Sequence, residues 1–180
     1  VVHLGGISFA GPSDDSSFYD VNVYGTLNLL DALVSLNKHP DRVILASSAS
    51  VYGQSDCEVL DESLCPNPIS HYGNSKLVME NMANGYRNKF PILITRPFNY
   101  TGLGHDVRFV IPKIVSAYDS RVSKLDLGDI NVFREFNDVR DVCVVYRLLL
   151  EASLSHHKLN ICSGRLINLK KIIDIMSGIS

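Results

Sequence analysis

Tyr72 and Lys76 are two residues whose types and spacing suit proton transfer. They lie four positions apart in the segment Tyr72-Gly-Asn-Ser-Lys76, which reads as the first turn of a helix, and side chains at i and i+4 share one helix face. A tyrosine in water titrates at about pH 10 and is a poor base at neutral pH. An ammonium group fixed beside it stabilises the phenolate. Because any helix can place these two residues by chance, the spacing alone is weak support for a catalytic site.

A short apolar strand is predicted upstream of this helix, in the segment Asp41-Arg-Val-Ile-Leu-Ala-Ser-Ser48. The segment ends in two hydroxyl residues, Ser47 and Ser48, and a loop follows it. A strand, a loop and a helix in this order bring hydroxyl, phenol and ammonium to the carboxyl end of a parallel sheet, where open α/β folds bind their ligands. We therefore expect Ser48, Tyr72 and Lys76 to form one catalytic group.

The rest of the chain alternates short apolar runs with helical periodicity. Beside the strand near Val43, the pattern predicts strands at residues 1–4, 92–95 and 158–162, extended segments at 124–127 and 132–136, and helices at 18–37, 70–89, 109–118, 139–151 and 168–176. This alternation predicts an α/β fold with a doubly wound parallel sheet that carries helices on both faces. A length of 180 residues is enough for a substantial core.

Composition argues against several other classes of function. Hydrophobic residues make up 46% and charged residues 20% of the chain, and the net charge is −2, all ordinary for a soluble globular protein. No basic block favours nucleic acid or an anionic membrane, and the longest strongly apolar stretch, residues 142–150, is too short to span a bilayer. The four cysteines show neither C-x-x-C spacing nor a matching histidine pair. We therefore predict no metal site, and we expect reduced thiols in a cytoplasmic protein.

Several motifs resemble those of the extended short-chain dehydrogenase/reductases that modify nucleotide sugars, the NAD-dependent epimerase/dehydratase group. Residues 2–6 are similar to a strand ending V-x-H-L-A-A, although both alanines are glycine here. Residues 22–26 are similar to N-V-x-G-T, residues 47–53 and 72–76 to the catalytic segments, residues 96–102 to R-P-F-N-x-T-G, and residues 133–142 to R-[DE]-[FWY]-x-x-V-x-D-V. These motifs follow one another in the family's order over nearly the whole chain, so coincidence is implausible.

The resemblance implies part of a Rossmann-like NAD(P)-binding domain. Residues 1–96 would hold its C-terminal half with the catalytic segment, and residues 97–180 would form a small substrate-binding subdomain interleaved with the last Rossmann elements. A strand and Gly-rich turn that receive the pyrophosphate of a dinucleotide are not found in the sequence, and the resemblance places them before Val1. We therefore expect an incomplete family member. NAD and NADP are not distinguished, because the residue that reads the ribose 2′-position follows a strand in the same upstream part.

The resemblance also assigns roles to single residues. Ser48 would bond the reacting sugar oxygen, Tyr72 would pass a proton to or from it, and Lys76 would hold the nicotinamide ribose. Asn99 would contact the sugar or its diphosphate, and Arg134 would neutralise the diphosphate through bidentate bonds. The alternatives are a Ser48 that only caps a turn and an Asn99 that only satisfies its own loop. Cofactor contacts are expected from Leu4, Gly5, Gly6, Ser47, Tyr72, Lys76 and Pro97, with a supporting hydrogen-bonding role for Asn22.

The residues after Ser48 narrow the reaction. Sugar 4,6-dehydratases of this family carry a carboxylate just before the Val/Leu-Tyr-Gly of this segment, whereas Ala49 and Ser50 stand here. Neither side chain is an acid or a base at neutral pH. We therefore rank first the NAD(P)H-dependent reduction of a 4-keto-6-deoxy nucleotide sugar. A GDP-linked sugar is favoured because residues 96–102 and 133–141 look closest to the GDP-4-keto-6-deoxy-mannose reductases.

Two alternatives stay open at this stage. One is an NAD-dependent nucleotide-sugar 4-epimerase, which needs the same three side chains. The other is a protein without catalysis that only binds a nucleotide sugar. In many relatives the two helices that correspond to residues 18–37 and 70–89 pair with those of a second copy, so the resemblance also implies a homodimer.

Overall fold

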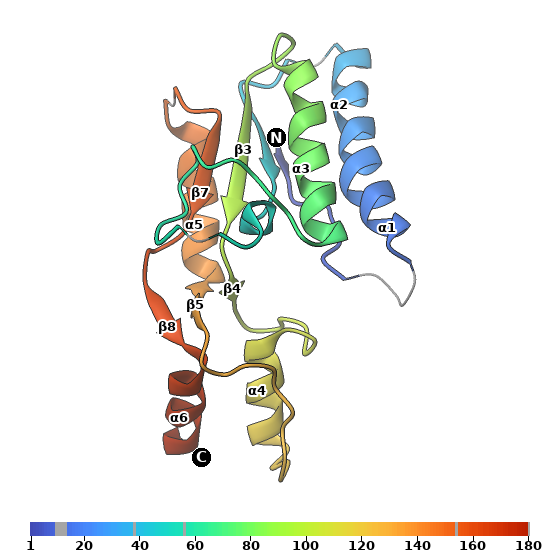
Figure 1. Cartoon of the computed structure of the whole chain (residues 1–180). Helices are drawn as coiled ribbons and strands as arrows, with labels where there is room; N and C mark the ends of the chain where they lie inside the picture. The colour runs from blue at the N-terminus through green and yellow to red at the C-terminus, as the bar shows by residue number, and fades with distance from the viewer. Residues whose placement is uncertain (10–13, 38, 56, 154, 180) are drawn as a thin grey trace. The chain divides into compact units, whose positions relative to one another are not determined.

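The computed structural model describes residues 1–9, 14–37, 39–55, 57–153 and 155–179 (Figure 1). Its internal contacts divide the chain into two compact units, Val1–Pro97 with Leu148–Ile161, and Phe98–Arg147 with Cys162–Ser180. None of the helices within the described ranges combines the length and the apolar character needed to cross a membrane.

A four-stranded parallel sheet forms the centre of the first unit. Its strands are β1 (Val2–His3), β2 (Val43–Ala46), β3 (Ile92–Pro97) and β7 (Lys158–Ile161), and they lie side by side in this order. The register pairs Ala46 with Thr95 on the next strand. Because all four strands run in the same direction, their carboxyl ends lie along one edge of the sheet. The predicted parallel α/β architecture is confirmed.

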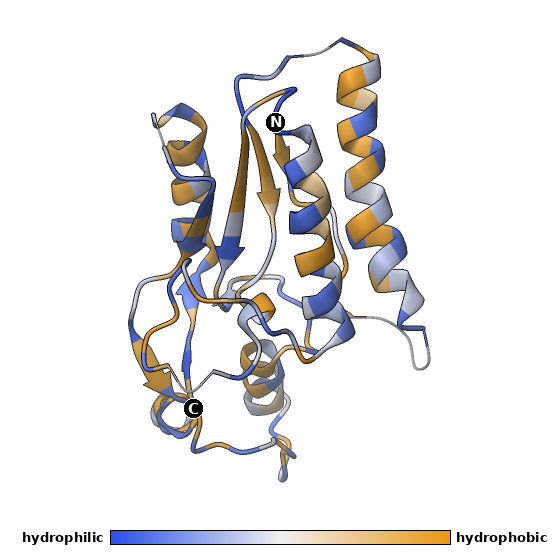
Figure 2. Ribbon diagram, turned by 45° about the horizontal axis from the view of Figure 1, so that its top comes forward, coloured by the Kyte–Doolittle hydropathy of each residue, from blue (hydrophilic) through white to orange (hydrophobic). Residues whose placement is uncertain are grey.

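Helices α2 (Gly25–Ser35) and α3 (His71–Ala83) cover one face of this sheet. Alternation along β2 and β3 directs every second apolar side chain towards these helices, and Figure 2 shows how hydrophobic the strands are. The resulting core holds residues that are at most 4% exposed: Leu30, Val43, Leu45, Met79, Ala83, Phe90, Ile92 and Ile94. The core therefore fixes α3, the predicted catalytic helix, against the ends of β2 and β3.

Two predicted helices are less regular than their periodicity suggested. The helix expected over residues 18–37 consists of α1 (Ser16–Tyr19), a π-helical turn η1 (Asp20–Tyr24) and α2. The helix expected over residues 70–89 ends as α3 at Ala83 and continues only as the 3-10 turn η3 (Asn84–Tyr86), where asparagine and glycine are poor helix formers. A π-helical turn is often found at functional sites.

The second unit holds short ladders and helices. Strand β4 (Tyr100–Thr101) pairs with β6 (Asn137–Asp138), and β5 (Phe133–Glu135) pairs with β8 (Leu166–Asn168). Helix α4 (Val110–Asp119) is linked to α6 (Leu169–Ile179) by a bond of 2.6 Å between the Tyr118 and Ser177 hydroxyls. Helix α5 (Val139–Glu151) contributes residues to both units.

One extended segment predicted for the second unit does not join a sheet. Residues 124–127 form no ladder. Lys124 and Asp126 in this segment are exposed and form an ion pair of 3.8 Å with each other. The short strands β4, β6 and β8 were not predicted, because pieces of two or three residues carry too little periodicity to be recognised.

Candidate active site

Lys76 is held at the carboxyl end of β2. Ser70 caps α3 by accepting a hydrogen bond of 3.1 Å from the Gly73 amide, which begins the helix just before Tyr72. One turn further on, Lys76 Nζ donates to the Ala46 carbonyl oxygen at 3.0 Å. The lysine is only 6% exposed, and burial lowers its pKa from the ordinary 10.5 to about 8. Lys76 is therefore a cation that the fold keeps at the sheet edge in spite of its desolvation.

Ser48 lies at the same edge, in the turn after β2. It caps the 3-10 turn η2 (Ala49–Tyr52), since its Oγ accepts from the Ser50 amide at 3.1 Å and donates to the Ser50 Oγ at 3.1 Å. The capping alternative therefore describes its local geometry. The cap also fixes the Ser48 hydroxyl at the place where β2 ends, so capping and a catalytic role do not exclude each other.

Glycine at position 73 lets α3 approach this turn closely. A Cβ atom at Gly73 would lie 2.7 Å from the Ser50 carbonyl oxygen and 2.9 Å from Pro68 Cβ, which no ordinary side chain permits. Gly53 closes the turn with a φ of +66°, and a Cβ atom there would lie 1.8 Å from the Asn67 carbonyl oxygen. Gly73 thus lets the first turn of α3 approach the Ser48 turn, and Gly53 lets that turn approach the loop before α3.

Tyr72 lies in the first turn of α3 and is half-buried. Its ring packs against Phe18 of α1, with ring centroids 6.1 Å apart and planes tilted by 56°. Its backbone carbonyl accepts a hydrogen bond of 2.8 Å from Ser75 Oγ. The structure therefore brings the three predicted catalytic residues, Ser48, Tyr72 and Lys76, into one unit at the carboxyl edge of its sheet.

Asn22 connects the segment after β1 to the catalytic helix. It lies in η1 and is completely buried. Its side chain forms two hydrogen bonds with the backbone of Ile7: Oδ1 accepts from the amide at 2.9 Å, and Nδ2 donates to the carbonyl at 3.0 Å. Its Nδ2 also donates to Ser75 Oγ at 3.0 Å. The supporting role expected for Asn22 has this physical form: it ties the loop that follows β1 to α3.

The predicted cofactor residues after β1 lie beside Lys76. Leu4, Gly5 and Gly6 are all exposed. A Cβ atom on Gly6 would lie 2.8 Å from Asn22 Oδ1, too close for an alanine without a shift, and 3.0 Å from Lys76 Nζ, which is a tight contact. The ribose of a dinucleotide can approach an exposed glycine backbone closely, and a neighbouring amine can donate hydrogen bonds to it. The residues present at this place therefore fit such a ribose.

His3 precedes this loop and has a structural environment. Its Nε2 forms a hydrogen bond of 3.0 Å with Thr26 Oγ1, which in turn donates to the Asn22 carbonyl at 2.8 Å. Burial, and then the positive charge of Lys76, lower the pKa of His3. The ring therefore supports the segment that carries Gly6 as a neutral group.

Two further predicted cofactor residues end the neighbouring strands. The Ser47 amide donates to the Thr95 carbonyl at 2.8 Å and its hydroxyl donates to Glu80 Oε1 at 2.6 Å, so both groups are used within the fold. Pro97 ends β3 opposite Ile161 of β7 and is half-buried. Both residues lie at the carboxyl edge that carries Ser48.

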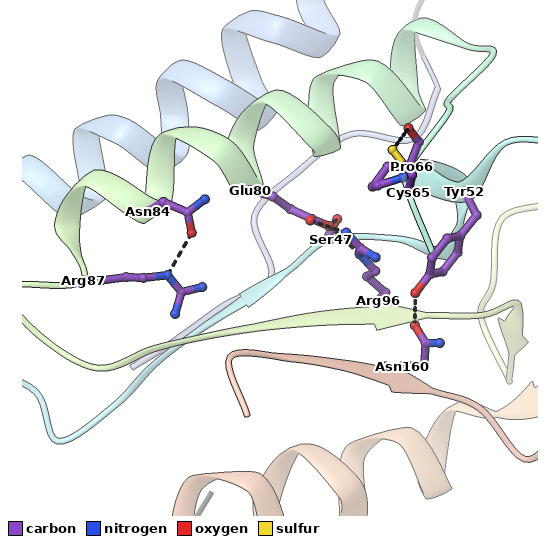
Figure 3. Close-up of polar contacts among 9 residues, drawn as sticks. All are labelled: Ser47, Tyr52, Cys65, Pro66, Glu80, Asn84, Arg87, Arg96 and Asn160. Carbon is purple, nitrogen blue, oxygen red and sulfur yellow. Dashed lines mark hydrogen bonds and ion pairs between the residues drawn. The ribbon is translucent and has the colours of Figure 1, made fainter. Parts of the chain in front are cut away.

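The main polar feature that sequence reasoning missed is a buried ion pair between Glu80 and Arg96 (Figure 3). Glu80 follows Lys76 by four residues on α3, and Arg96 stands near the end of β3; their side chains are 4% and 0% exposed. The sequence did contain a sign that Glu80 belongs with the other two residues, because positions 72, 76 and 80 follow at intervals of four and share one helix face.

Of the three predicted substrate residues, Asn99 and Arg134 belong to the second unit. The Asn99 carbonyl accepts two bonds from Asn137, from its amide at 2.9 Å and from its Nδ2 at 3.2 Å. Arg134 lies on β5, is exposed, and donates to the Phe133 carbonyl at 2.9 Å. In the same unit, Arg140 forms an ion pair of 2.5 Å with Asp138.

The family model described as GDP-mannose 4,6 dehydratase matches residues 1–178. The chain belongs to this family. This confirms the resemblance to enzymes that modify nucleotide sugars. At the two positions before Val51-Tyr52-Gly53, where a carboxylate is expected in a dehydratase, this chain has Ala49 and Ser50.

Named relatives give a finer comparison. The chain is 37% identical to a GDP-6-deoxy-D-talose 4-dehydrogenase of Aggregatibacter actinomycetemcomitans, covering 100% of this chain and 61% of that protein. It is 32% identical to a GDP-6-deoxy-D-mannose reductase of Pseudomonas aeruginosa, covering 100% of this chain and 62% of that protein. The chain therefore spans about 60% of the length of these relatives.

Solved structures share the fold. RMD from Pseudomonas aeruginosa, complexed with NADPH, superposes with a TM-score of 0.90 at 31% identity, over 99% of this chain and 65% of that one. A putative epimerase from Burkholderia cenocepacia J2315 gives a TM-score of 0.87 at 42% identity, over 99% of this chain and 57% of that one. These matches confirm the Rossmann-like fold class for the described part of the chain.

Proposed function

We propose that the protein reduces, with NADH or NADPH, the C4 ketone of a GDP-linked 4-keto-6-deoxy sugar. The observation that carries this proposal is the Lys76 amine, which is buried and bonded to Ala46 O at 3.0 Å on the helix of Tyr72 and next to the Ser48 turn. The names of two relatives, a GDP-6-deoxy-D-talose 4-dehydrogenase and a GDP-6-deoxy-D-mannose reductase, support a GDP-linked 6-deoxy sugar as the substrate.

Three side chains would perform the proton transfer. The Ser48 hydroxyl would donate a hydrogen bond to the ketone oxygen, and the Tyr72 phenol would give that oxygen its proton as it becomes an alcohol. The Lys76 ammonium would stabilise the phenolate that remains on Tyr72. When bound, the reduced nicotinamide supplies the hydride.

The remaining residues would bind the two ligands. Gly6 and its neighbours Leu4 and Gly5 would contact the dinucleotide together with Ser47, Tyr72, Lys76 and Pro97, and the close approach of Gly6 to Lys76 supports this assignment. In the second unit, Asn99 would contact the sugar or diphosphate, and the exposed guanidinium of Arg134 would bind the diphosphate.

We also propose a homodimer in the cytoplasm. The helices η1, α2 and α3 carry apolar side chains that are 39–57% exposed: Val21, Tyr24, Val34 and Val78. Pairing these helices with those of a second copy would cover such side chains. A mass measurement in solution tests the dimer, and a monomer at micromolar concentration would contradict it.

An epimerase is the second candidate function. It is favoured by the 42% identity to the structure named a putative epimerase, and it would use the same three side chains. It differs in the products: a reductase consumes one NAD(P)H for each sugar, whereas an epimerase regenerates its cofactor.

The full-length protein should therefore be incubated with GDP-4-keto-6-deoxy-D-mannose and NADPH or NADH. Stoichiometric loss of the reduced cofactor and formation of a GDP-6-deoxyhexose is the expected result. Interconversion of nucleotide-sugar 4-epimers without net cofactor consumption would replace the reductase by the epimerase. Titration calorimetry that detects nucleotide-sugar binding but no NAD(P)H binding would favour a protein that only binds.

A further inference from the structure

The Glu80–Arg96 pair is bidentate and buried. Arg96 Nε donates to Glu80 Oε1 at 2.9 Å and Arg96 Nη2 donates to Oε2 at 2.6 Å. Although burial opposes the charged guanidinium, the bonds to Glu80 keep the pKa of Arg96 above its ordinary value. The guanidinium therefore stays charged in the fold.

Glu80 also accepts a third bond, from Ser47. The Ser47 hydroxyl donates to Glu80 Oε1 at 2.6 Å, the same oxygen that faces Arg96 Nε. Ser47 is 3% exposed and immediately precedes Ser48. Since the Ser47 amide is bonded to Thr95, residue 47 is held both by its backbone and by its side chain.

Tyr52 extends this network to the turn that follows Ser48. The Arg96 guanidinium lies 4.8 Å from the centre of the Tyr52 ring, a distance at which the cation is attracted to the ring face. Tyr52 Oη then donates to Asn160 Oδ1 on β7 at 2.8 Å, as Figure 3 shows. The two ends of the Ser48 segment, Ser47 and Tyr52, are thus both fixed by contact with one ion pair.

Stability alone does not account for such a pair. Apolar residues of similar volume often replace a buried ion pair without loss of stability, and sometimes with a gain. A buried ion pair that also accepts hydrogen bonds favours one arrangement of the residues around it. The reason is that a polar group left without its partner is costly in a low dielectric. Here the geometry selected is that of the strand end beside the catalytic helix.

We propose that Glu80 and Arg96 are positioning residues that hold Ser47, and through it the Ser48 hydroxyl, in register with Tyr72 and Lys76. This inference rests on the function proposed above. Glu80 shares α3 with Tyr72 and Lys76, so its bond to Ser47 couples the helix to the serine turn directly. A displacement of about 1 Å in a reacting group lowers a rate by up to about 100-fold, so this coupling acts on turnover.

Two double variants separate positioning from simple stability. Glu80→Met with Arg96→Met removes both charges and leaves the Ser47 hydroxyl without its acceptor. Glu80→Gln with Arg96→Met also removes both charges but keeps an amide oxygen that Ser47 can donate to. The first variant is expected to lose about 10- to 100-fold in kcat with little change in the KM for the sugar or in the Kd for NADPH, and the second is expected to recover most of that loss.

Hydrogen exchange supplies a readout that does not depend on activity. In the Glu80→Met/Arg96→Met variant, the amides of Ser50 and Val51 in the serine turn are expected to exchange at least about 10-fold faster, while the amide of Leu93 in the core of β3 keeps its protection. Equal kcat values and equal Ser50 exchange in wild type and both variants would overturn the proposal. If the wild-type protein shows no reductase turnover, the proposed function fails, and the exchange rates still decide the positioning role.

Discussion

Lys76 Nζ donates to the carbonyl oxygen of Ala46 at 3.0 Å, which fixes the amine of the catalytic helix on the last residue of β2. This single bond joins two segments that the sequence separates by a long loop. It also holds the amine in a position where it is 6% exposed. The fold therefore keeps a desolvated cation at this edge of the sheet, at a cost in stability.

Replacing Lys76 by methionine is expected to stabilise the protein at neutral pH. Since the pKa of Lys76 is about 8 in the fold and 10.5 in the unfolded chain, the unfolded chain binds more protons between these values. Stability therefore rises with pH through this window, and the full penalty is present below pH 8. We expect Lys76→Met to unfold at a higher urea concentration at pH 7. Its free energy of unfolding should be higher by about 1–3 kcal/mol, once the loss of the hydrogen bond to Ala46 is subtracted from the gain.

The gain should shrink at pH 10, where Lys76 is mostly neutral in the folded protein. The exposed Lys89 supplies the matched control, because Lys89→Met removes a lysine without relieving a buried charge. A gain of equal size at pH 7 and pH 10 would show that packing, and not desolvation, explains the effect.

Tyr72→Phe removes the phenol hydroxyl, which is the proposed proton donor. The ring contact with Phe18 is preserved, so thermal stability is expected to change by less than about 1 kcal/mol. The kcat for ketone reduction is expected to fall by about 100- to 10,000-fold, which is the usual contribution of a general acid. Thermal unfolding measures the stability, and steady-state kinetics measures kcat.

The control for this variant is Tyr24→Phe, which removes a phenol that is 57% exposed. It should keep the wild-type kcat. Turnover by Tyr72→Phe at a wild-type rate would remove Tyr72 from the catalytic group.

Gly73→Ala is expected to disturb the serine turn. Its Cβ would lie 2.7 Å from the Ser50 carbonyl oxygen and 2.9 Å from Pro68 Cβ, so α3 and the turn must move apart. We expect a loss of about 1–3 kcal/mol, as for an overpacked core, together with reduced turnover. Gly85→Ala is the matched control, because a Cβ there meets nothing within 4 Å; it should be neutral or slightly stabilising.

Asn22→Ala tests the link between the loop after β1 and α3. The variant leaves the half-buried amide and carbonyl of Ile7 without their partner, and a polar group that loses its partner away from water costs up to about 1–3 kcal/mol. We expect a loss of about 2–4 kcal/mol in urea unfolding. Asn88→Ala at an exposed position should stay within about 0.5 kcal/mol of wild type, and a similar value for Asn22→Ala would mean that water replaces its bonds.

Local pattern was sufficient for the regular elements. Apolar periodicity over residues 139–151 predicted α5 with its observed bounds, and the apolar run at Val43 predicted a buried strand. Local pattern did not predict the π-helical turn η1. Asn22 in this turn bonds to Ile7, fifteen residues away in the chain, and a local pattern does not contain that contact. The hydrogen-bond partner of a polar side chain is a group that lies near it in the folded protein, and hydrophobic periodicity along the sequence does not predict which group that is.

The sequence by itself determined the fold class, and it placed Ser48, Tyr72 and Lys76 at one edge of a parallel sheet, because the order strand, loop, helix dictates that edge. Only the tertiary structure decided that Lys76 is buried and bonded to Ala46, and that Glu80 and Arg96 form an ion pair holding Ser47. The reason is physical: the burial and pKa of a charged group follow from everything packed around it, and those neighbours come from segments far apart in the chain.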